Sequence, residues 1–553
     1  MRLLLTMAII SISCSISWSQ EGLPIDDVEV IREYEANLQL SKAILTSPDL
    51  IEVSSPAIDN QYDIDIGEVD LDYPPPYIRP IGMRPEKNPS IYHGYIQALY
   101  GTLNNPVLHG EYDVYKKDYF NLGAAVHYEA FSDQDVLNKK YRKASGEVRG
   151  TYFLTEQTKI NALVSYERES VFFYGLQDSA FTSIQDSPLD SQNIQRDISH
   201  VQLTSSITQN INQSLIAEGG FQYGLNSSND SGIDENHIEA YGKIKYYTLK
   251  SLTAQVQAGI DYTFLNQDID DRQFKHVYIE PSISFSKSKY SLHLSTRLLN
   301  DTEQSYFLPN VSIKTNLSKE ISLLLSGKSY ITKHSLENLL TVNPFYNQSF
   351  TSSTNAVHQD ISLTIDYHKV KQLSIKAQVG YQIFKDHYFF LNDFGDYTFN
   401  NIEVLTANKP LEFSKITDDA TDIYFRTELR YPVSNMINFR GQIEKHFINV
   451  DNIEKAWHVS SLNASLGADA SLLQDRLMIG SSIHIQDGVP FIGLVDSGKT
   501  GIQYDLSVDI KARVIDRVML NFQAMNLLNS EYERWNGYAN FGLHLNGGII
   551  VKL

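Results

Sequence analysis

The 553-residue sequence contains a single cysteine, Cys14, and it lies within the first twenty residues. The stretch "MRLLLTMAIISISCSISWSQ" has Arg2, an apolar run and then small polar residues, which is typical of a secretory signal peptide at residues 1–20. Its cleavage leaves a chain without cysteine, which excludes disulfides and cysteine-ligated metals. A lipoprotein acylated on Cys14 is the alternative, although Ser11 stands where a branched aliphatic residue is usual.

Long apolar runs and an excess of basic charge are also missing. After the signal peptide no stretch approaches about 18 consecutive apolar residues, so the sequence predicts no membrane-spanning helix. The 46 Lys and Arg face 66 Asp and Glu, a net charge of −20, which argues against nucleic acid as a partner. The motifs His-Glu-x-x-His and Gly-x-Ser-x-Gly do not occur. We therefore predict a protein that is not an enzyme and has no cofactor or metal.

One stretch fits a nucleotide-binding motif. "GLVDSGKT" (493–500) satisfies the phosphate-loop pattern G-x-x-x-x-G-K-[ST] at each specified position. Such a loop binds phosphate only where a strand precedes it and a helix follows, because the helix N-terminus supplies the amide donors. Thr500 is followed instead by "IQYDLSVDIKARV", which alternates apolar and polar residues as a strand does. We interpret the match as a coincidence and predict no nucleotide.

Aromatic residues and two-residue alternation are abundant, with 34 Tyr and 25 Phe in the chain. In "IQYDLSVDIKARV" (502–514), Leu506 and Val508 lie on an apolar face and Ser507 on a polar one. An exported chain that lacks spanning helices can cross a membrane only as a closed β-barrel. In such a barrel the apolar face meets lipid and the polar face lines the lumen. We therefore expect outer-membrane lipid around Leu506 and Val508.

The spacing of the connections supports a barrel over residues 91–553. Short polar turns near 116–118, 154–158, 210–213, 249–251, 287–289, 317–319, 369–372, 433–436, 471–475 and 514–517 make ten. Eleven other connections, most of them long, alternate with these turns. Short periplasmic turns and long outer loops are typical of outer-membrane barrels. The sequence predicts an all-β, transmembrane antiparallel barrel of about 22 strands (range 20 to 24), with a sandwich array as the alternative.

Residues 21–90 differ in composition from the rest. They hold nine of the 17 prolines, and 15 Asp or Glu against five Lys or Arg. Such a segment buries little apolar surface, so we predict an extended periplasmic or lumen-filling segment. Its acidic residues could meet basic residues that we expect to face the lumen, namely Arg426, Arg430, Arg440, Lys511 and Arg513.

Several stretches resemble the barrel of TonB-dependent outer-membrane receptors, particularly the Bacteroidota branch. "NLLNSEYERWNGYANFGLHLNGGIIVKL" (526–553) resembles the closing strands of that family. "YIEPSISFS" (278–286) and "FLPNVSIKTNLS" (307–318) resemble its proline-containing strand starts, and "NPFYNQSF" (343–350) the segment before a middle strand. "VEVIREYEANLQLSKAI" (28–44) resembles the start of a subgroup that has a barrel but lacks the standard plug.

The resemblance implies an outer-membrane barrel for substrate uptake or passage. Asp27, Val28, Glu29, Val30 and Ile31 resemble the TonB box, which pairs as an added strand with a TonB-type energising protein. A disordered tail with chance alternation is the other interpretation. The alternative function is a non-transporting scaffold barrel that binds a surface lipoprotein or secretion component. The third alternative is a soluble secreted β-rich enzyme or adhesin. Carboxylates of the acidic loop runs 230–235 and 268–271 could bind Ca²⁺, although solvated loop charge is the plainer explanation.

Overall fold

The computed structural model describes the chain from Tyr92 to Leu553, with gaps. The described ranges are 92–117, 119–136, 138–174, 195–229, 232–249, 251–266, 273–301, 304–348, 354–369, 373–393, 412–493 and 497–553. The expected signal peptide, the segment 21–90 and the TonB-box-like stretch 27–31 therefore lie outside the described residues, and so does the acidic run 268–271.

Twenty-two antiparallel strands form one sheet that closes on itself. Closure is made by β1 and β26, which pair from Tyr95 opposite Lys552 to Gly101 opposite Asn546. The strands are β1 (Gly94–Gly101), β2 (Asn105–Lys117), β3 (Phe120–Ser132), β4 (Lys140–Thr155), β5 (Thr158–Phe172), β6 (Gln195–Asn212), β7 (Leu215–Ser228), β8 (Asp234–Leu249), β9 (Leu252–Leu265), β10 (Gln273–Lys287), β11 (Tyr290–Asn300), β12 (Ser305–Asn316), β13 (Ile321–Lys333), β14 (Asn355–His368), β15 (Ser374–Asp393), β16 (Glu412–Pro432), β17 (Ile437–Val450), β18 (Leu462–Leu472), β19 (Leu477–Gln486), β22 (Gln503–Ile515), β23 (Val518–Met525) and β26 (His544–Lys552). The predicted fold class and strand number are confirmed.

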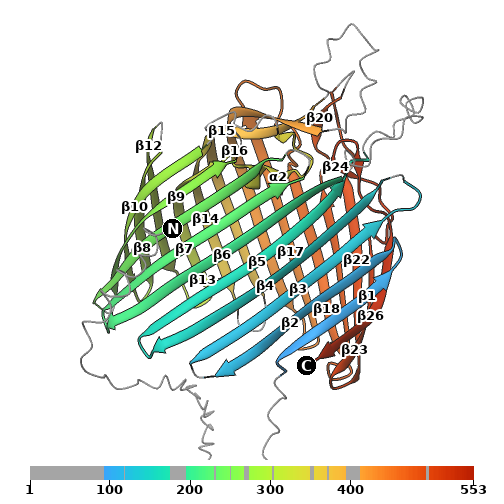
Figure 1. The fold of residues 1–553 in the computed structure, drawn as a ribbon, viewed down its shortest axis with the longest axis horizontal. Coiled ribbons are helices and arrows are strands. Elements are labelled where there is room, and N and C mark those ends of the chain that lie inside the picture. Colours follow the sequence, from blue (N-terminus) through green and yellow to red (C-terminus); the bar gives the residue numbers. More distant parts are fainter. Residues whose placement is uncertain are drawn as a thin grey trace, which may run out of the picture. The chain divides into compact units, whose positions relative to one another are not determined.

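The two ends of the barrel differ. Each of the ten predicted turns joins two consecutive barrel strands, and the eleven other connections all lie at the opposite end. We call these the turn end and the loop end. The connections at the loop end contain the helix α2 (Leu336–Val342) and two small hairpins, β20 (Pro490–Ile492) with β21 (Ser497–Lys499) and β24 (Glu533–Trp535) with β25 (Tyr538–Ala539). Figure 1 shows α2, β20 and β24 together at the top, with the C-terminus at the other end.

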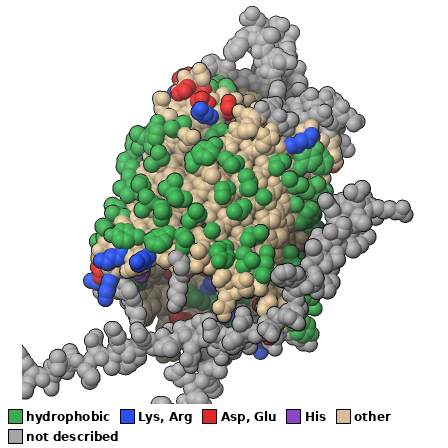
Figure 2. Space-filling model, turned by 90° about the vertical axis from the view of Figure 1, so that its left-hand side faces the viewer, with side chains coloured by type: hydrophobic (Ala, Val, Ile, Leu, Met, Phe, Trp, Pro, Cys, Tyr) green, Lys and Arg blue, Asp and Glu red, His purple; other side chains and the backbone are tan. Residues whose placement is uncertain are grey.

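The pairing register separates an apolar outer face from a polar inner face. On β22, Leu506 lies opposite Ile483 of β19 and Ser507 lies opposite Ser482. Residues opposite each other in antiparallel strands share a face of the sheet, so the two apolar residues lie on one face and the two serines on the other. On β16 the outward Phe425 is 50% exposed, whereas the inward neighbour Tyr424 is 3% exposed. On the side that Figure 2 shows, apolar side chains are spread over the middle of the outer face, and the charged side chains lie mainly toward its upper and lower edges. This distribution fits a barrel surrounded by lipid.

Two prolines depart from the expectation that they mark strand starts. Pro281 lies inside β10 and Pro309 inside β12. The pairing between β10 and β11 leaves out residues 280–281, and the pairing of β12 with β13 begins only at Asn310. Since proline cannot donate to a ladder, it is tolerated where the ladder is already interrupted. These prolines are therefore tolerated because pairing with an adjacent strand is interrupted there, and not because they lie at the start of a strand.

The phosphate-loop match does not have the structure that phosphate binding requires. Lys499 ends β21, and Thr500 closes the loop by exchanging 2.9 Å hydrogen bonds with the backbone of Val489. Thr500 is followed by the strand β22, so no helix N-terminus faces the loop. Among the described residues, no helix is long and apolar enough to cross a membrane.

Candidate functional site

The described part of the loop end contains an apolar core that we call the cap. Its buried residues come from connections and strand ends far apart in the sequence: Val171, Phe173, Ile233, Leu336, Leu339, Leu340, Phe345, Tyr346, Phe390, Phe413, Trp535 and Tyr538. Leu336, Leu339, Tyr346 and Phe413 have no exposed surface. The α2 segment and the β24–β25 hairpin therefore pack against each other and against the ends of the strands, as a domain core does.

Aromatic rings make the closest contacts of the cap. Phe345 stacks on Tyr538 with ring centroids 3.7 Å apart. Trp535 meets Phe413 edge-on at 5.2 Å and Phe390 at 5.4 Å. Aromatic pairs in these geometries stabilise by about 0.5–1.5 kcal/mol beyond their buried area. The hairpin that carries Trp535 and Tyr538 thus joins the α2 segment to β15 and β16.

Arg196, at the start of β6, anchors the cap to the barrel wall. Its side chain is 1% exposed, and its Nη1 donates to the carbonyl oxygens of Pro344 and Tyr346 at 2.8 Å each. Its Nη2 lies 2.7 Å from the Oε1 of Glu412 at the start of β16. A buried guanidinium is tolerated only when its donors are satisfied in this way. The position of the 344–346 backbone is therefore fixed by a buried charge.

Glu235 of β8 holds the other end of the same segment. Its Oε2 accepts from the backbone N–H of Leu336 at 2.7 Å, and its Oε1 accepts from that of Glu337 at 3.0 Å. Ser335 is the N-cap residue and accepts from the N–H of Asn338 at 3.3 Å. The first amides of a helix lack internal partners, so a wall carboxylate that binds them fixes where the helix begins.

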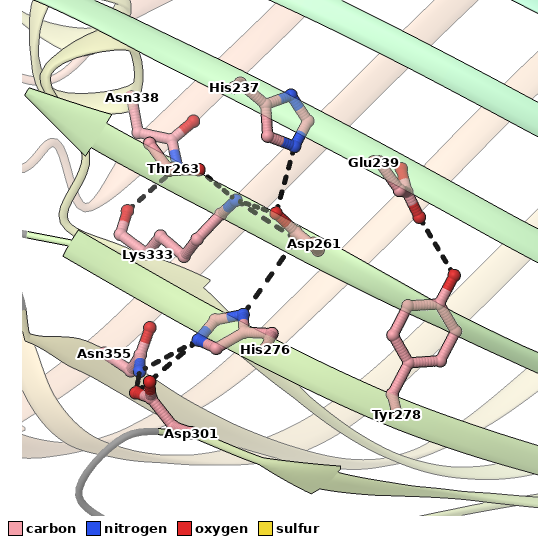
Figure 3. Close-up of polar contacts among 10 residues, drawn as sticks. All are labelled: His237, Glu239, Asp261, Thr263, His276, Tyr278, Asp301, Lys333, Asn338 and Asn355. Carbon is pink, nitrogen blue, oxygen red and sulfur yellow. Dashed lines mark hydrogen bonds and ion pairs between the residues drawn. The ribbon is translucent and has the colours of Figure 1, made fainter. Parts of the chain in front are cut away.

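A polar network lies next to α2 on the inner wall (Figure 3). Asp261 of β9 accepts from the Nζ of Lys333, at the end of β13, with distances of 2.8 and 3.1 Å to its two oxygens. The same ammonium donates to the Oγ1 of Thr263 at 2.9 Å. Strands β9 and β13 are separated by three others, so this ion pair crosses the interior instead of running along the wall. The Nδ2 of Asn338 donates to the carbonyl of Lys333 at 2.8 Å and connects α2 to the network.

The network continues toward β11 and β14 through His276. Its Nδ1 lies 3.9 Å from the Oδ2 of Asp261 and its Nε2 lies 3.5 Å from the Oδ2 of Asp301. Asn355 donates to that same Oδ2 of Asp301 at 2.7 Å. His237 of β8 approaches Asp261 from the other side, with 3.0 Å from its Nε2 to Oδ1. The inner wall beside the cap is thus polar but internally paired.

Two histidines of the connections are held neutral by the cap. Burial lowers the pKa of His334 to about 3, and the Lys415 ammonium beside it acts in the same direction. Burial also lowers the pKa of His458 to about 4. The ring of His458 packs between Phe413 at 5.1 Å and Trp535 at 5.4 Å. Protonating either ring places a charge in this apolar surrounding, which opposes closure.

A cavity of about 440 Å³ opens in the inner wall between β13 and β17, nearer the turn end than the cap. It is lined by Leu324, Ser326, Lys328, Asp360, Ser362, Thr364, Lys376, Gln378, Gln382, Tyr424, Arg426, Glu444 and His446. Cavities of this size hold small molecules, and the lining of most small-molecule sites in proteins is largely apolar with only a few polar groups. Nearly all the lining here is polar or charged, so the cavity is suited to a hydrophilic ligand.

The predicted lumen residues occupy different surroundings and do not form one site. Arg426 lines the cavity, with its Nη2 2.5 Å from the Oε1 of Glu444. Arg440 lies 3.1 Å from Asp469, and Lys511 lies 2.9 Å from Asp509. Arg430 stands opposite Arg440 in the register, and neither Arg430 nor Arg513 forms an ion pair with any described residue. The acidic partner expected for these residues, segment 21–90, lies outside the described residues.

Sequence reasoning did not identify the anchors of the cap. Arg196, Glu235 and Lys333 each lie at a strand end beside a long loop, where a solvated charge is the usual interpretation. Within the acidic run 230–235, Glu235 caps α2 while residues 230–231 lie outside the description. No group of three or more acidic, histidine or cysteine side chains in the described ranges could hold a metal ion.

Comparison with known proteins identifies the fold. No family model matches the sequence, and no curated protein matches it. Among solved structures, the FrpB iron transporter from Neisseria meningitidis (F3-3 variant) matches with 8% identity and a TM-score of 0.64, covering 84% of this chain and 82% of that one. The ferric-catecholate import receptor Fiu from E. coli K12 matches with 9% identity and a TM-score of 0.63, covering 84% of this chain and 82% of that one.

A third structure, the siderophore receptor PirA from Acinetobacter baumannii, matches with 9% identity and a TM-score of 0.61, covering 85% of this chain and 81% of that one. Identities this low establish the likeness of fold and leave the ligand of this chain open. The chain has the β-barrel fold of outer-membrane transporters and receptors.

Proposed function

We propose that this chain is a TonB-dependent receptor-like barrel of the outer membrane that takes up or passes a substrate, with the cap as its gate. The observation that carries the proposal is the combination of a polar inner wall and an apolar core at the mouth. The wall holds a cavity of about 440 Å³, and side chains of α2 and of the β24–β25 hairpin pack together at the loop end. A closure built from connections can open while the ladders of the barrel stay intact.

Solved structures of the same fold support transport as the general function. Their names describe an iron transporter, a ferric-catecholate import receptor and a siderophore receptor. The stretches at 278–286, 307–318 and 526–553 support placement in the Bacteroidota branch. The stretch at 28–44 supports its plug-lacking subgroup, and we include both assignments in the proposal.

The N-terminal part of the proposal concerns residues outside the described ranges. Residues 1–20 are removed on export, and residues 21–90 then lie in the periplasm or in the lumen. Residues 27–31 pair as an added strand with a TonB-type energising protein. Replacing Val30 with Pro removes a backbone donor that strand pairing needs, so cross-linking to that protein should be lost. The Val30→Thr variant keeps the donor and should still cross-link, and equal cross-linking of both variants would rule out strand pairing.

A reversible covalent closure of the cap tests passage. Tyr346 and Phe413 form an isolated parallel bridge between the α2 segment and β16. Bridge partners lie within the Cα separation that a disulfide requires, so the double variant Tyr346→Cys/Phe413→Cys should close the cap when oxidised. We expect liposomes that contain the full-length variant to release a trapped small dye more slowly when the cysteine pair is oxidised than when it is reduced. Equal release in both states, with the disulfide confirmed by mass spectrometry, would exclude the cap as a gate.

The second candidate function is a scaffold barrel that binds a surface lipoprotein or secretion component and passes nothing. The specific observation in its favour is the dry aromatic closure of the cap, in which Phe345, Tyr538 and Trp535 are all buried. A scaffold predicts no dye release in either redox state of the cysteine pair. It also predicts that exchanging the outer loops abolishes capture of a partner while the barrel still folds.

A further inference from the structure

The cavity between β13 and β17 brings three cationic side chains to one surface of the lumen. Lys328 comes from β13, Lys376 from β15 and Arg426 from β16. Asp360 of β14 and Glu444 of β17 lie among them. In a formal count the lining therefore carries three positive and two negative charges with His446 neutral. The balance of free donors and free acceptors decides which ligand fits.

The two carboxylates are already engaged by neutral and cationic donors of the wall. The hydroxyl of Tyr424 lies 3.2 and 3.1 Å from the two oxygens of Asp360, and the Nε2 of Gln382 donates to its Oδ2 at 3.2 Å. The Oε1 of Glu444 lies 2.5 Å from Arg426 Nη2 and 3.1 Å from His446 Nε2. These contacts weaken the attraction of both carboxylates for a cationic ligand.

The cations, in contrast, keep donors that no carboxylate occupies. Lys328 stands opposite Asp360 in the register but forms no ion pair with any described residue. Lys376 is 47% exposed and forms one long ion pair, with Glu428 at 3.7 Å. Arg426 is 39% exposed to the lumen even while it pairs with Glu444. An ammonium has three donors and a guanidinium five, so these three side chains of the lining have more donors than the contacts named here use.

We propose that this cavity binds a small hydroxylated organic anion, whose carboxylate or phosphate lies between Lys328 and Arg426. Gln378, Ser362 and Thr364 of the same lining offer donors and acceptors to hydroxyl groups. A volume of about 440 Å³ accommodates a sugar acid or a sugar phosphate. The inference deepens the proposed function by naming the class of substrate, and it rests on passage through this lumen.

Calorimetry on the full-length protein in detergent tests the site directly, with glucuronate, glucose 6-phosphate and neutral glucose as probes. We expect at least one of the two anionic probes to bind more tightly than glucose. Whether glucuronate or glucose 6-phosphate binds more tightly then shows whether the site prefers a carboxylate or a phosphate. The Lys328→Gln variant should lower that affinity at least about tenfold, since a charge-assisted contact is lost. Lys328 is exposed and forms no ion pair with the residues that the structure describes, so this change leaves none of them as an unpaired buried partner and the barrel should fold.

The matched control is Lys159→Gln, which removes an exposed lysine from the inner face of β5. This variant should bind the probes as the unchanged protein does. Glucose binding as tightly as glucuronate, or Lys328→Gln binding unchanged, would overturn the anion site. If dye release responds to the cysteine pair while no anion binds, passage stands and this inference fails. If the anion binds while dye release never changes, the site stands and the passage proposal fails.

Discussion

Removing the guanidinium of Arg196 should loosen the cap while leaving the barrel folded. The Arg196→Met variant keeps most of the apolar volume but removes the 2.7 Å contact with Glu412 and the two hydrogen bonds that Arg196 donates to the carbonyls of Pro344 and Tyr346. Breaking a buried, hydrogen-bonded charge pair costs about 3–5 kcal/mol. At about 1.4 kcal/mol per tenfold, the population of the open cap should rise by roughly 10² to 10⁴.

Hydrogen exchange measures this population directly. The backbone N–H groups of Leu339, Asn343 and Tyr346 bond to carbonyls within the same segment at 3.0, 2.8 and 3.1 Å. A helix of seven residues is not stable in water without its packing, so these amides should exchange when the segment leaves the core. Their exchange should accelerate by the factor above in Arg196→Met, while amides at the centre of β5 and β6 stay protected. The control is Arg297→Met, because Arg297 pairs with Glu280 at 2.8 Å but is 40% exposed.

A half-exposed ion pair contributes about 0–1 kcal/mol, so Arg297→Met should change cap exchange less than about sixfold. If Arg196→Met accelerates the three cap amides no more than Arg297→Met does, the anchoring role of Arg196 is wrong. In that case the apolar contacts of Phe345 and Tyr538 alone position the segment.

Three further predictions address the gate, the faces and the N-terminal segment. His334 and His458 have pKa values of about 3 and about 4 in the closed cap and near 6.5 when solvated, so the open cap binds more protons below pH 6.5. Cap amides should therefore exchange faster as the pH falls from about 6.5 toward 4, after correction for the intrinsic exchange rate. The double variant His334→Gln/His458→Gln should flatten this pH dependence. Leu506→Arg should cost roughly 2–4 kcal/mol of stability at the lipid face, whereas Ser507→Arg on the inner face should be tolerated, and equal unfolding midpoints would contradict the face assignment. Deleting residues 21–85, which lie outside the described ranges, should raise ion conductance in planar bilayers if this acidic segment occupies the lumen; unchanged conductance would indicate a periplasmic docking arm.

Local patterns were sufficient to predict the barrel. Alternation in "IQYDLSVDIKARV" reports which face meets lipid, because burial in a membrane imposes a two-residue period on each strand. Short turns such as 433–436 and 471–475 need particular residues within a few positions, so they are visible in the sequence. Counting them fixed the strand number at 22 and placed both ends of the strand array at the turn end, as in the structure.

The cap could not be predicted, because its contacts have no period and join distant segments. Arg196 and Glu412 are separated by 216 positions, and Glu235 and Leu336 by 101. Each of these residues taken alone is an ordinary polar residue at a strand end. Trp535 and Tyr538 lie in an aromatic loop, where the interface girdle of a barrel is an equally good explanation. Only closure of the barrel brings these residues to the same mouth.

The chemistry of the cap explains why its closure can be both tight and reversible. Apolar side chains such as Leu339 and Phe345 exclude water from the core of the cap, but the burial of apolar surface alone does not select one packing arrangement of these side chains. Arg196 and Glu235 supply that selection, because displacing the segment leaves a buried charge unpaired and intermediate positions are therefore costly. In the proposed gate, a segment held in this way has two states rather than a continuum, closed with all anchors made or open with all of them solvated. Asp261 and Lys333 pair below the cap, and Asn338 of α2 donates to the carbonyl of Lys333. Movement of the cap in the proposed gate therefore changes one contact of this network, while the Asp261–Lys333 pair itself does not depend on α2.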